Sequence, residues 1–406
     1  MPRGVPFKVR LTIPMITRNL ARPLRQLARI YPVVTVTGPR QSGKTTLCRS
    51  VFPRKAYVSL EPMDVRSAVA EDPRGFLQEY RAGVVIDEVQ HVPDLLSYLQ
   101  VEVDERPAPG RFILTGSQHF GLSHAVTQSL AGRTGMLQLL PLSLDELRRF
   151  DRAPTDLFTT LWAGAYPRIH DRGIPADRWL ADYVTTYVQR DVRQVLNIGD
   201  LESFTTFLRL CAGRTAQEVN LSTLGADAGV NHNTARAWLS VLETSFLCVR
   251  LPAWHPNVRK QMVKAPKLHF LDSGLVCHLL GIRTPDQLRH HPLRGSIFES
   301  WLVAEIYKAQ AHRGAVPRLW HYRDAKRLEV DAIVEMTDAL ALVEAKSGAT
   351  VGAEAIEPLR RLAAALHAHR EHRRLALRLV YGGDDRLRRG DVTIVPWHDV
   401  QRAGWA

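Results

Sequence analysis

A glycine-rich segment near residue 40 carries the residue types that bind nucleotide phosphates. Residues 38–45 match the pattern GxxxxGK[ST]; a β-branched run at 33–37 precedes them and a helix-forming stretch follows. The glycines allow backbone N–H groups to face the phosphates, and the helix N-terminus adds partial positive charge. Lys44 is expected to reach the β- and γ-phosphates, and the Thr45 hydroxyl to bind Mg²⁺. The residues expected to contact the nucleotide here are Gly38, Pro39, Arg40, Gln41, Ser42, Gly43, Lys44, Thr45 and Thr46.

Two acidic residues follow a second apolar run and supply the carboxylates that a bound magnesium ion requires. The run covers residues 84–86, and Asp87 and Glu88 come directly after it. Asp87 is expected to hold Mg²⁺ through water, and Glu88 to polarise the water that attacks the γ-phosphate. The alternative is a strand that ends in two solvated acids.

Polar residues after a third strand and one arginine complete the candidate nucleotide site. Residues 112–116 predict a strand, and ligands of an open parallel sheet bind at the carboxyl ends of its strands. Ser117 or Gln118 is therefore expected to sense the γ-phosphate, unless these residues only cap the next turn. Arg133 is a candidate arginine finger, or a sensor within the same subunit, because charge developing on the γ-phosphate requires a delocalised cation.

A second group of charged residues lies near the C-terminus on two predicted strands. Asp331 lies in the run 329–334, and Glu344 and Lys346 lie in the run 341–347. Glu344 and Lys346 are two positions apart, so their side chains point to one face of the strand. Two carboxylates with a glutamate from a helix can bind a divalent metal. A lysine beside them can orient or deprotonate a water that attacks a phosphodiester.

The order of the N-terminal motifs resembles the prokaryotic AAA-type ATPase domain. The motifs are GPRQSGKTT, VVIDEVQ, ILTGSQ, LAGR and PLSLDEL. GAYP at 164–167 and YVQRDV at 187–192 are similar to linking motifs of the family in which this domain precedes an uncharacterised C-terminal region. The resemblance extends from about residue 20 to about residue 379. It implies nucleotide binding, with ATP and Mg²⁺ as cofactors.

The C-terminal charged group resembles the active-site pattern of the restriction-endonuclease-like fold. That pattern is an Asp followed by Glu-x-Lys, with an upstream glutamate on a helix. By position, the matching residues are Asp331, Glu344, Lys346 and Glu299. The resemblance implies that Glu299, Asp331 and Glu344 hold a metal. A degenerate nuclease fold that binds without cutting is the alternative, and a structural Glu344–Lys346 salt bridge is a third interpretation.

The middle of the chain predicts a helix-turn-helix with a wing. A short helix at 221–230 ends in a glycine turn, and a second helix at 233–242 is capped by Asn231 or Asn233. Residues 247–251 and 267–271 predict the wing strands, and the cations at 259–267 are expected to contact phosphates. A winged helix used only as a lid or a protein interface is the alternative.

Composition and charge bound the class of protein. The chain has 406 residues, enough for two or three domains, and its 45% hydrophobic and 23% charged residues exclude a disordered or collagen-like chain. It has no 18-residue apolar run and no CxxC pair, and its N-terminal residues are not expected to form a signal peptide. We expect a cytoplasmic protein with reduced thiols and no membrane partner. The net charge of +13 favours a nucleic-acid partner. The alternative is that the arginines are solvated surface residues that bind no partner.

These observations predict an α/β protein: a P-loop NTPase parallel sheet with helices, a winged-helix middle domain and a restriction-endonuclease-like α/β C-terminal domain. The expected divisions are an ATPase domain at 1–155, a helical linker at 156–200, a winged-helix-like domain at 201–280 and the nuclease-like domain at 281–406. The function they favour is an ATPase that acts on DNA. A nucleotide-controlled switch whose nuclease-like domain only binds is the competing class. A homo-oligomer is required only if Arg133 acts on a neighbouring subunit.

Overall fold

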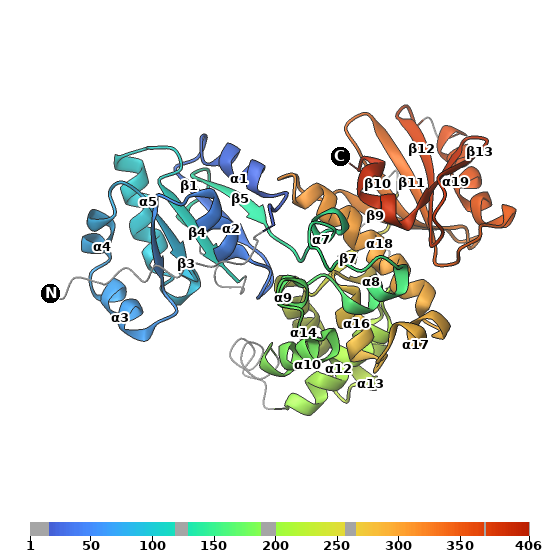
Figure 1. Ribbon diagram of the computed structural model, residues 1–406, viewed down its shortest axis with the longest axis horizontal. Helices are drawn as coiled ribbons and strands as arrows, with labels where there is room; N and C mark the ends of the chain where they lie inside the picture. Colours follow the sequence, from blue (N-terminus) through green and yellow to red (C-terminus); the bar gives the residue numbers. More distant parts are fainter. Residues whose placement is uncertain (1–15, 118–128, 188–199, 256–264, 369–370, 406) are drawn as a thin grey trace.

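The first part of the chain is a parallel sheet with helices on both faces, as predicted. The computed structural model describes residues 16–117, 129–187, 200–255, 265–368 and 371–405. Five parallel strands have the order β2-β3-β4-β1-β5 (Figure 1). The strands are β1 (Val33–Thr37), β2 (Ala56–Ser59), β3 (Val84–Asp87), β4 (Phe112–Gly116) and β5 (Thr134–Gln138). The connecting elements are α1 (Ala21–Leu27), α2 (Lys44–Val51), α3 (Met63–Glu71), α4 (Pro73–Glu79), η1 (Val89–His91) and α5 (Leu95–Glu105).

Alternation along β1 explains why both faces of this sheet are covered. Val33 belongs to the core that includes Leu99 of α5, whereas Val34 and Val36 belong to the core that includes Leu47 of α2. A central parallel strand that is buried on both faces has an apolar or β-branched residue at every position. The loop after β1 therefore has a rigid support at the carboxyl edge of the sheet.

The middle of the chain is helical and carries a small antiparallel sheet. Its helices are α7 (Leu144–Leu147), α8 (Leu157–Ala163), α9 (Pro167–Arg172), α10 (Ala176–Tyr187), α12 (Leu201–Gly213), α13 (Leu221–Asp227) and α14 (His232–Thr244). The strands β6 (Gln217–Glu218), β7 (Cys248–Leu251) and β8 (Lys267–Phe270) have the order β6-β8-β7. Asn231 caps α14 by accepting a hydrogen bond from the Thr234 N–H at 2.9 Å. The helix pair and both predicted wing strands are thus present at the expected positions.

The last part is a six-stranded mixed sheet packed between helices. It follows α16 (Ser273–Leu279), α17 (Pro285–His290) and α18 (Arg294–Ala311), and its order is β13-β14-β12-β11-β10-β9. The strands are β9 (Leu319–Arg323), β10 (Glu329–Glu335), β11 (Ala339–Lys346), β12 (Arg374–Tyr381), β13 (Leu387–Arg389) and β14 (Val392–Pro396). The remaining helices are η3 (Ala353–Ile356), α19 (Glu357–Ala368) and η4 (Trp397–Ala403).

Two cores cover the two faces of the mixed sheet. Val343 packs in the cluster that contains the α18 residue Trp301, while Leu342 packs with Leu359 of α19. The first of these clusters contains residues from Leu142 to Trp405. One core thus includes residues on both sides of position 280, where the sequence predicts a domain boundary. That boundary stays a prediction.

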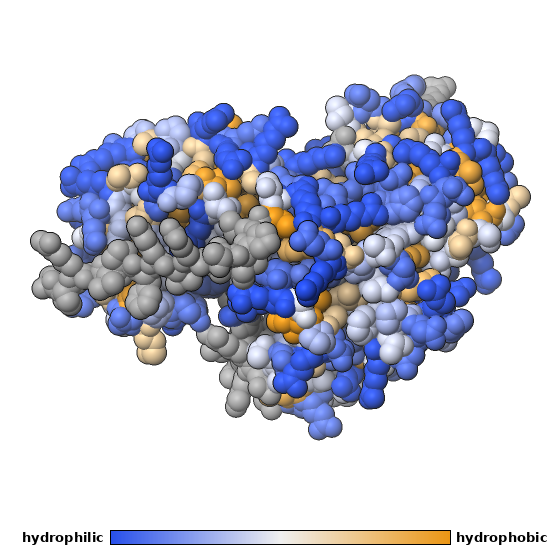
Figure 2. Space-filling model, in the orientation of Figure 1, coloured by the Kyte–Doolittle hydropathy of each residue, from blue (hydrophilic) through white to orange (hydrophobic). Residues whose placement is uncertain are grey.

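The surface and the buried cysteines agree with a chain that packs its apolar cores away from water. The face in Figure 2 shows hydrophobic residues in small areas separated by hydrophilic ones. The four cysteines are buried free thiols, namely Cys48, Cys211, Cys248 and Cys277. Within the described ranges, no helix has the length and apolar character needed to cross a membrane.

Candidate functional site

The glycine-rich loop connects β1 to α2, as the sequence predicts. Gly38 and Gly43 have φ angles of 148° and 93°, a region that L-residues rarely adopt. A Cβ atom on Gly38 would lie 2.1 Å from the Leu139 carbonyl oxygen, so only glycine fits there. α2 begins at Lys44, directly after Gly43. The backbone N–H groups of the first turn are therefore available at a helix N-terminus for a phosphate group.

Lys44 lies folded back over this loop. Its Nζ donates hydrogen bonds to the carbonyl oxygens of Gly38 (3.0 Å) and Pro39 (2.8 Å). Burial lowers the pKa of the ammonium group, while the carboxylates of Glu88 and Asp87 act in the opposite direction. An ammonium group binds a phosphate more strongly than it binds two carbonyl oxygens. We therefore expect Lys44 to leave these carbonyl groups when a triphosphate binds.

The structure brings Thr45 and Asp87 into direct contact. The Thr45 hydroxyl lies 3.0 and 2.9 Å from the two carboxylate oxygens of Asp87. Tyr57 also donates to Asp87, at 2.7 Å, and so does Thr115. A hydroxyl and a carboxylate beside a phosphate loop are hard oxygen donors of the kind that Mg²⁺ prefers, so these residues fit the ion. The sequence analysis missed Tyr57 and Thr115; the position of Thr115 on β4 beside β3 was the signal for it.

Glu88 follows Asp87 in the left-handed backbone region, with φ 57° and ψ 47°. Gln90 donates to Glu88 Oε2, and the Ser117 hydroxyl donates to the same oxygen at 3.2 Å. Burial would raise the pKa of the carboxyl group, but the nearby Lys44 ammonium and the Gln90 hydrogen bond bring it below its usual range. Glu88 is thus ionised at neutral pH, as a group that accepts a proton from water must be.

The other predicted nucleotide residues have less specific positions. Arg40 is half-buried, and Gln41 and Thr46 are exposed. Ser117 is beside Glu88, so the structure brings it to the site, whereas Gln118 is outside the described residues.

Arg133 corrects one part of the sequence-based interpretation. It immediately precedes β5, and the parallel pairing of β5 with β1 puts it at the amino edge of the sheet, opposite the phosphate loop. Its guanidinium binds Asp104 at 2.6 and 2.8 Å. Arg133 cannot reach a phosphate on its own subunit from the far edge of the sheet. A role in the site of a neighbouring subunit stays a prediction.

Arg18 is a residue near the phosphate loop that the sequence analysis did not find. It is 8% exposed and donates to the carbonyl oxygens of Ser42 (2.7 Å) and Leu140 (2.8 Å). Its Nε donates to Glu146 Oε1 at 3.0 Å. Arg18 therefore connects the loop to the segment that follows β5. The Ser-x-x-Glu spacing at Ser143 and Glu146, typical of a capping box, was the available signal for Glu146.

Glu146 continues this connection to α18. It is fully buried, and its Oε2 lies 3.3 Å from Nδ1 of His312, the residue that follows α18. Burial would raise the pKa of this carboxyl group, but Arg18 and His312 hold it well below its usual range. Nearby, Lys308 of α18 donates to the Leu142 carbonyl oxygen at 3.0 Å. Buried polar contacts, of which the Arg18–Glu146 pair is ionic, thus join the phosphate loop to the helix that also carries Glu299.

The C-terminal carboxylates gather at the strand ends of the mixed sheet. Asp331 of β10 accepts a hydrogen bond from the Ala345 N–H at 2.8 Å. Glu344 and Lys346 of β11 form an ion pair at 2.7 Å. The second Glu344 oxygen is buried with no hydrogen-bond partner. Burial, together with the nearby Asp331, raises the pKa of Glu344 to about 8.

Glu299 departs from the predicted ligand set. Its carboxylate binds the ammonium group of Lys267 at 3.0 Å, and that side chain is only 3% exposed. Among the residues that the structure describes, no three His, Cys, Asp or Glu side chains form a group suited to a metal. Asp331 and Glu344 fit a divalent ion, because one buried oxygen lacks a partner; Glu299 does not fit. The assignment of Lys267 to DNA phosphates is also wrong, because the residue is buried in this ion pair.

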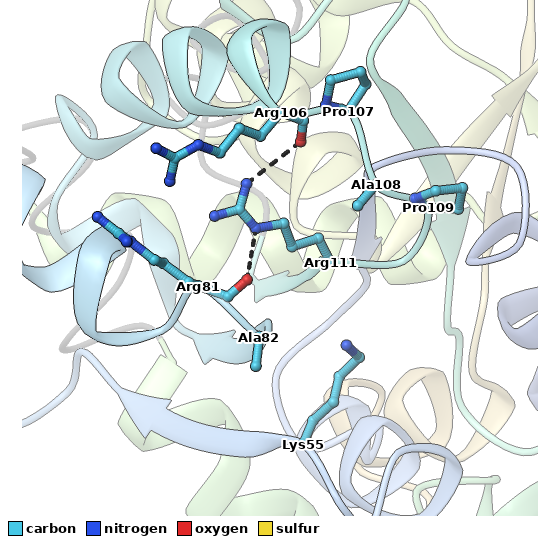
Figure 3. Close-up of a pocket in the computed structure, with 8 residues that line it drawn as sticks. All are labelled: Lys55, Arg81, Ala82, Arg106, Pro107, Ala108, Pro109 and Arg111. Atoms are coloured by element: carbon cyan, nitrogen blue, oxygen red, sulfur yellow. Dashed lines mark hydrogen bonds between the residues drawn. The ribbon is translucent and has the colours of Figure 1, made fainter.

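A separate hollow lies at the amino edge of the parallel sheet. Its volume is about 370 Å³, and Figure 3 shows Arg111 within it, donating to the carbonyl oxygens of Arg81 and Arg106. Lys55 and Arg111 directly precede β2 and β4, so the hollow is at the edge opposite the phosphate loop. It is not the predicted nucleotide site. The lining residues are Lys55, Arg81, Ala82, Arg106, Pro107, Ala108, Pro109 and Arg111.

Comparison with protein families agrees with the class of protein that the loop and the sheet define. Residues 31–148 match the family described as AAA domain, which agrees with the phosphate loop and the parallel sheet of this part of the chain. Residues 154–286 and 294–400 match two further families, described as domain of unknown function DUF8612 and domain of unknown function DUF4143. The description of the family matched by residues 294–400 names no nuclease, so the restriction-endonuclease-like interpretation stays a prediction.

The chain is also similar to particular proteins. Proteins of Mycobacterium tuberculosis and Mycobacterium bovis, both described as uncharacterized, are 29% identical over 326 residues, which is 79% of this chain and 71% of each relative. A Walker-type ATPase of Pyrococcus abyssi superposes with a TM-score of 0.43 and 15% identity, over 64% of this chain and 94% of that one. The RuvB Holliday junction branch migration motor of Thermotoga maritima superposes with a TM-score of 0.33 and 20% identity, over 58% of this chain and 90% of that one.

Proposed function

We propose that this protein is an ATP hydrolase that uses its nucleotide state to act on DNA. The observation that carries the ATPase part is the contact of Thr45 with Asp87 directly beneath the phosphate loop, with ionised Glu88 as the next residue. A magnesium ion held by Thr45 and Asp87 would neutralise charge on the β- and γ-phosphates.

Each side chain then has one task in the reaction. The ammonium group of Lys44 leaves its two carbonyl partners and binds the phosphates. Glu88 orients a water and accepts its proton while the water oxygen bonds to the γ-phosphorus. The bond between that phosphorus and the bridging oxygen breaks, and ADP leaves. Ser117 holds the Glu88 carboxylate in position through its hydroxyl.

Two variants test the ATPase. K44A should lose ATP binding, measured by equilibrium titration with a fluorescent ATP analogue, because no other lysine is in this loop. E88Q should bind ATP as the wild type does and hydrolyse it at least about 100-fold more slowly, in the range that a general base contributes. K55A is the matched control, since Lys55 lies at the opposite edge of the sheet. Normal turnover by E88Q would assign the base elsewhere, and unchanged affinity in K44A would remove the loop from the nucleotide site.

The DNA part of the proposal is supported by charge and by the middle of the chain. The sequence carries a net charge of +13, and α14 follows α13 after a short turn, with Arg236 on its exposed face. This is the arrangement in which a second helix enters a groove. Binding of a fluorescent duplex should weaken linearly in a plot of log K against log salt concentration. An affinity that does not change with salt would exclude phosphate contacts.

A second candidate function is a nucleotide-controlled switch whose C-terminal domain binds DNA without cutting it. The Lys267–Glu299 ion pair favours it, because a glutamate of the nuclease-like pattern is occupied by an ammonium group. Plasmid nicking with Mn²⁺, by wild type and by D331A, separates the two candidates. Nicking that D331A abolishes supports the nuclease. Absence of cleavage in both proteins, with DNA binding retained, supports the switch.

A further inference from the structure

The middle sheet contributes a lysine to the C-terminal carboxylate site. Lys267 begins β8, and its backbone pairs with Leu251 of β7 on one side and Glu218 of β6 on the other. From this position its side chain extends into the mixed-sheet region and is 3% exposed. Nζ lies 3.0 Å from Glu299 Oε1 and 2.5 Å from Glu329 Oε1. An ammonium group that is this deeply buried requires carboxylates at such distances.

The two sheets are joined where this lysine crosses between them. The Trp254 N–H donates to the His321 carbonyl oxygen at 2.6 Å, and the His321 N–H donates to that of Pro252 at 2.9 Å. The His321 ring also lies 3.2 Å from the Ala265 carbonyl oxygen, two residues before Lys267. The segment that follows β7 and the residue two positions before the lysine are thus both bonded to β9. These backbone hydrogen bonds hold Lys267 in its position among the carboxylates.

The charges of the site point to a single divalent ion. Four carboxylates gather here, those of Glu299, Glu329, Asp331 and Glu344, and two ammonium groups, those of Lys267 and Lys346, face them. When all six are ionised, the excess charge is that of two carboxylates, which one divalent cation neutralises. The buried Glu344 oxygen that lacks a hydrogen-bond partner is available to bind such an ion.

We propose that Lys267 is a fixed cation of this site, which occupies Glu299 in place of a metal ion and leaves Asp331 and Glu344 to bind one divalent cation. The inference deepens the nuclease outcome of the plasmid-nicking test above, and it rests on the proposal that the C-terminal site acts on DNA. The cation is a hard ion such as Mg²⁺ or Mn²⁺, which binds through one or two carboxylates and completes its shell with water or phosphate oxygens. Lys267 is a positioning residue: it holds Glu299 and Glu329 through its charge.

Binding of Mn²⁺ to the nucleotide-free full-length chain tests the assignment. Free Mn²⁺ is counted by its electron paramagnetic resonance signal, and unfolding is followed in parallel to establish that each variant is folded. The wild type should bind one ion at this site. E344Q should weaken that binding at least tenfold, whereas E299Q should leave it within twofold, because Glu299 is already paired. If E299Q lost as much Mn²⁺ affinity as E344Q, the proposal would be overturned.

The lysine itself is tested by K267M, with K55M as the control for removal of a lysine elsewhere. K267M frees Glu299 and Glu329, so we expect it to bind a second Mn²⁺ and to regain with Mn²⁺ the thermal stability that it loses without it. The double variant K267M/E299Q should not take up the second ion. A K267M protein that binds no more Mn²⁺ than the wild type contradicts the proposal. These outcomes are measured without DNA, so a failure to cleave or bind DNA is a separate result.

Discussion

At the scale of single residues, Asp87 shows how a site for a metal ion is held together before the ion arrives. Three hydroxyl groups converge on its carboxylate, from Thr45, Tyr57 and Thr115. Each comes from a different element, α2, β2 and β4. The carboxylate is 5% exposed, so these donors replace the water that an exposed carboxylate would bind.

Y57F tests this arrangement. Removing one donor to a buried carboxylate should lower the free energy of unfolding by about 1.5 to 3 kcal/mol, the usual range for a hydrogen bond to a charged group. Urea denaturation of the nucleotide-free protein measures the loss. Y98F is the control, since the Tyr98 hydroxyl is not a donor to Asp87 in the described structure. Equal losses in the two variants would show that the hydrogen bond from Tyr57 to Asp87 adds no stability beyond that of an ordinary tyrosine hydroxyl.

The residues that the sequence could predict are those fixed by local spacing. Lys44 and Thr45 are set by a pattern of eight residues, and Asp87 and Glu88 by the end of an apolar strand. Arg18 and Lys267 reach their partners over 24 to 128 positions and 32 positions, respectively. No spacing rule covers such contacts, because only the packed fold determines them. Lys267 was visible as one of few lysines, but its sequence neighbours suggested a surface role.

At the scale of elements, α18 is a helix whose two ends serve different sites. Its first half carries Glu299, which binds Lys267, and its last residue is followed by His312, which faces Glu146. The sequence indicates this helix only weakly, although it covers Arg294–Ala311. The reason is its burial on nearly all sides, which weakens the apolar periodicity that marks a helix in a sequence.

E146Q removes the charge at the C-terminal end of this helix. Arg18 then lacks its ionic partner in a buried setting, so we expect a loss of about 3 to 5 kcal/mol in the free energy of unfolding. Denaturation by urea measures it. E105Q, at the exposed end of α5, should change stability by less than about 0.5 kcal/mol. A small loss in E146Q would mean that Arg18 is satisfied by its two carbonyl contacts alone.

The same carboxylate gives the stability a defined dependence on pH. The folded state holds the pKa of Glu146 well below its usual value through Arg18 and His312. The unfolded state therefore binds more protons over this range, and stability falls as the pH falls from the unfolded pKa toward the folded one. Between pH 7 and pH 3 the wild type should lose more stability than E146Q, which has no such group. Parallel curves for the two proteins would assign the acid sensitivity to other carboxylates.

At the scale of the whole molecule, the nucleotide domain and the C-terminal domain are connected through buried charges. The Ser42 carbonyl oxygen of the phosphate loop, Arg18, Glu146 and His312 form an unbroken series of contacts. A ligand that orders the phosphate loop is therefore expected to stabilise the C-terminal end of α18 as well. Nucleotide at 100 times its dissociation constant adds about 2.7 kcal/mol to the stability of the folded state.

The division into parts was predictable, but the way the parts meet was not. The alternation of strand and helix over the first 138 residues differs from the helical segment that follows, and the sequence shows this change. The core that continues from Leu142 to Trp405 is assembled from residues hundreds of positions apart. Apolar patterns reveal which face of each helix is buried, but they do not identify the helix or sheet that buries it.

Hydrogen exchange tests whether the series of contacts carries the effect of nucleotide to α18. With ADP and Mg²⁺ bound, the amides of the last turn of α18 should exchange several-fold more slowly, because Arg18 then holds Glu146, and through it His312, against a more rigid loop. R18M should bind ADP yet lose this added protection, since its side chain has no charge with which to bridge Ser42 and Glu146. The amides of α19, on the opposite face of the mixed sheet, are the internal control and should not respond in either protein. If R18M retained the full protection at α18, coupling would pass through contacts that do not involve Arg18, such as the Lys308 hydrogen bond to the Leu142 carbonyl oxygen or the apolar cluster of Leu140 with Ala304 and Ala311 of α18.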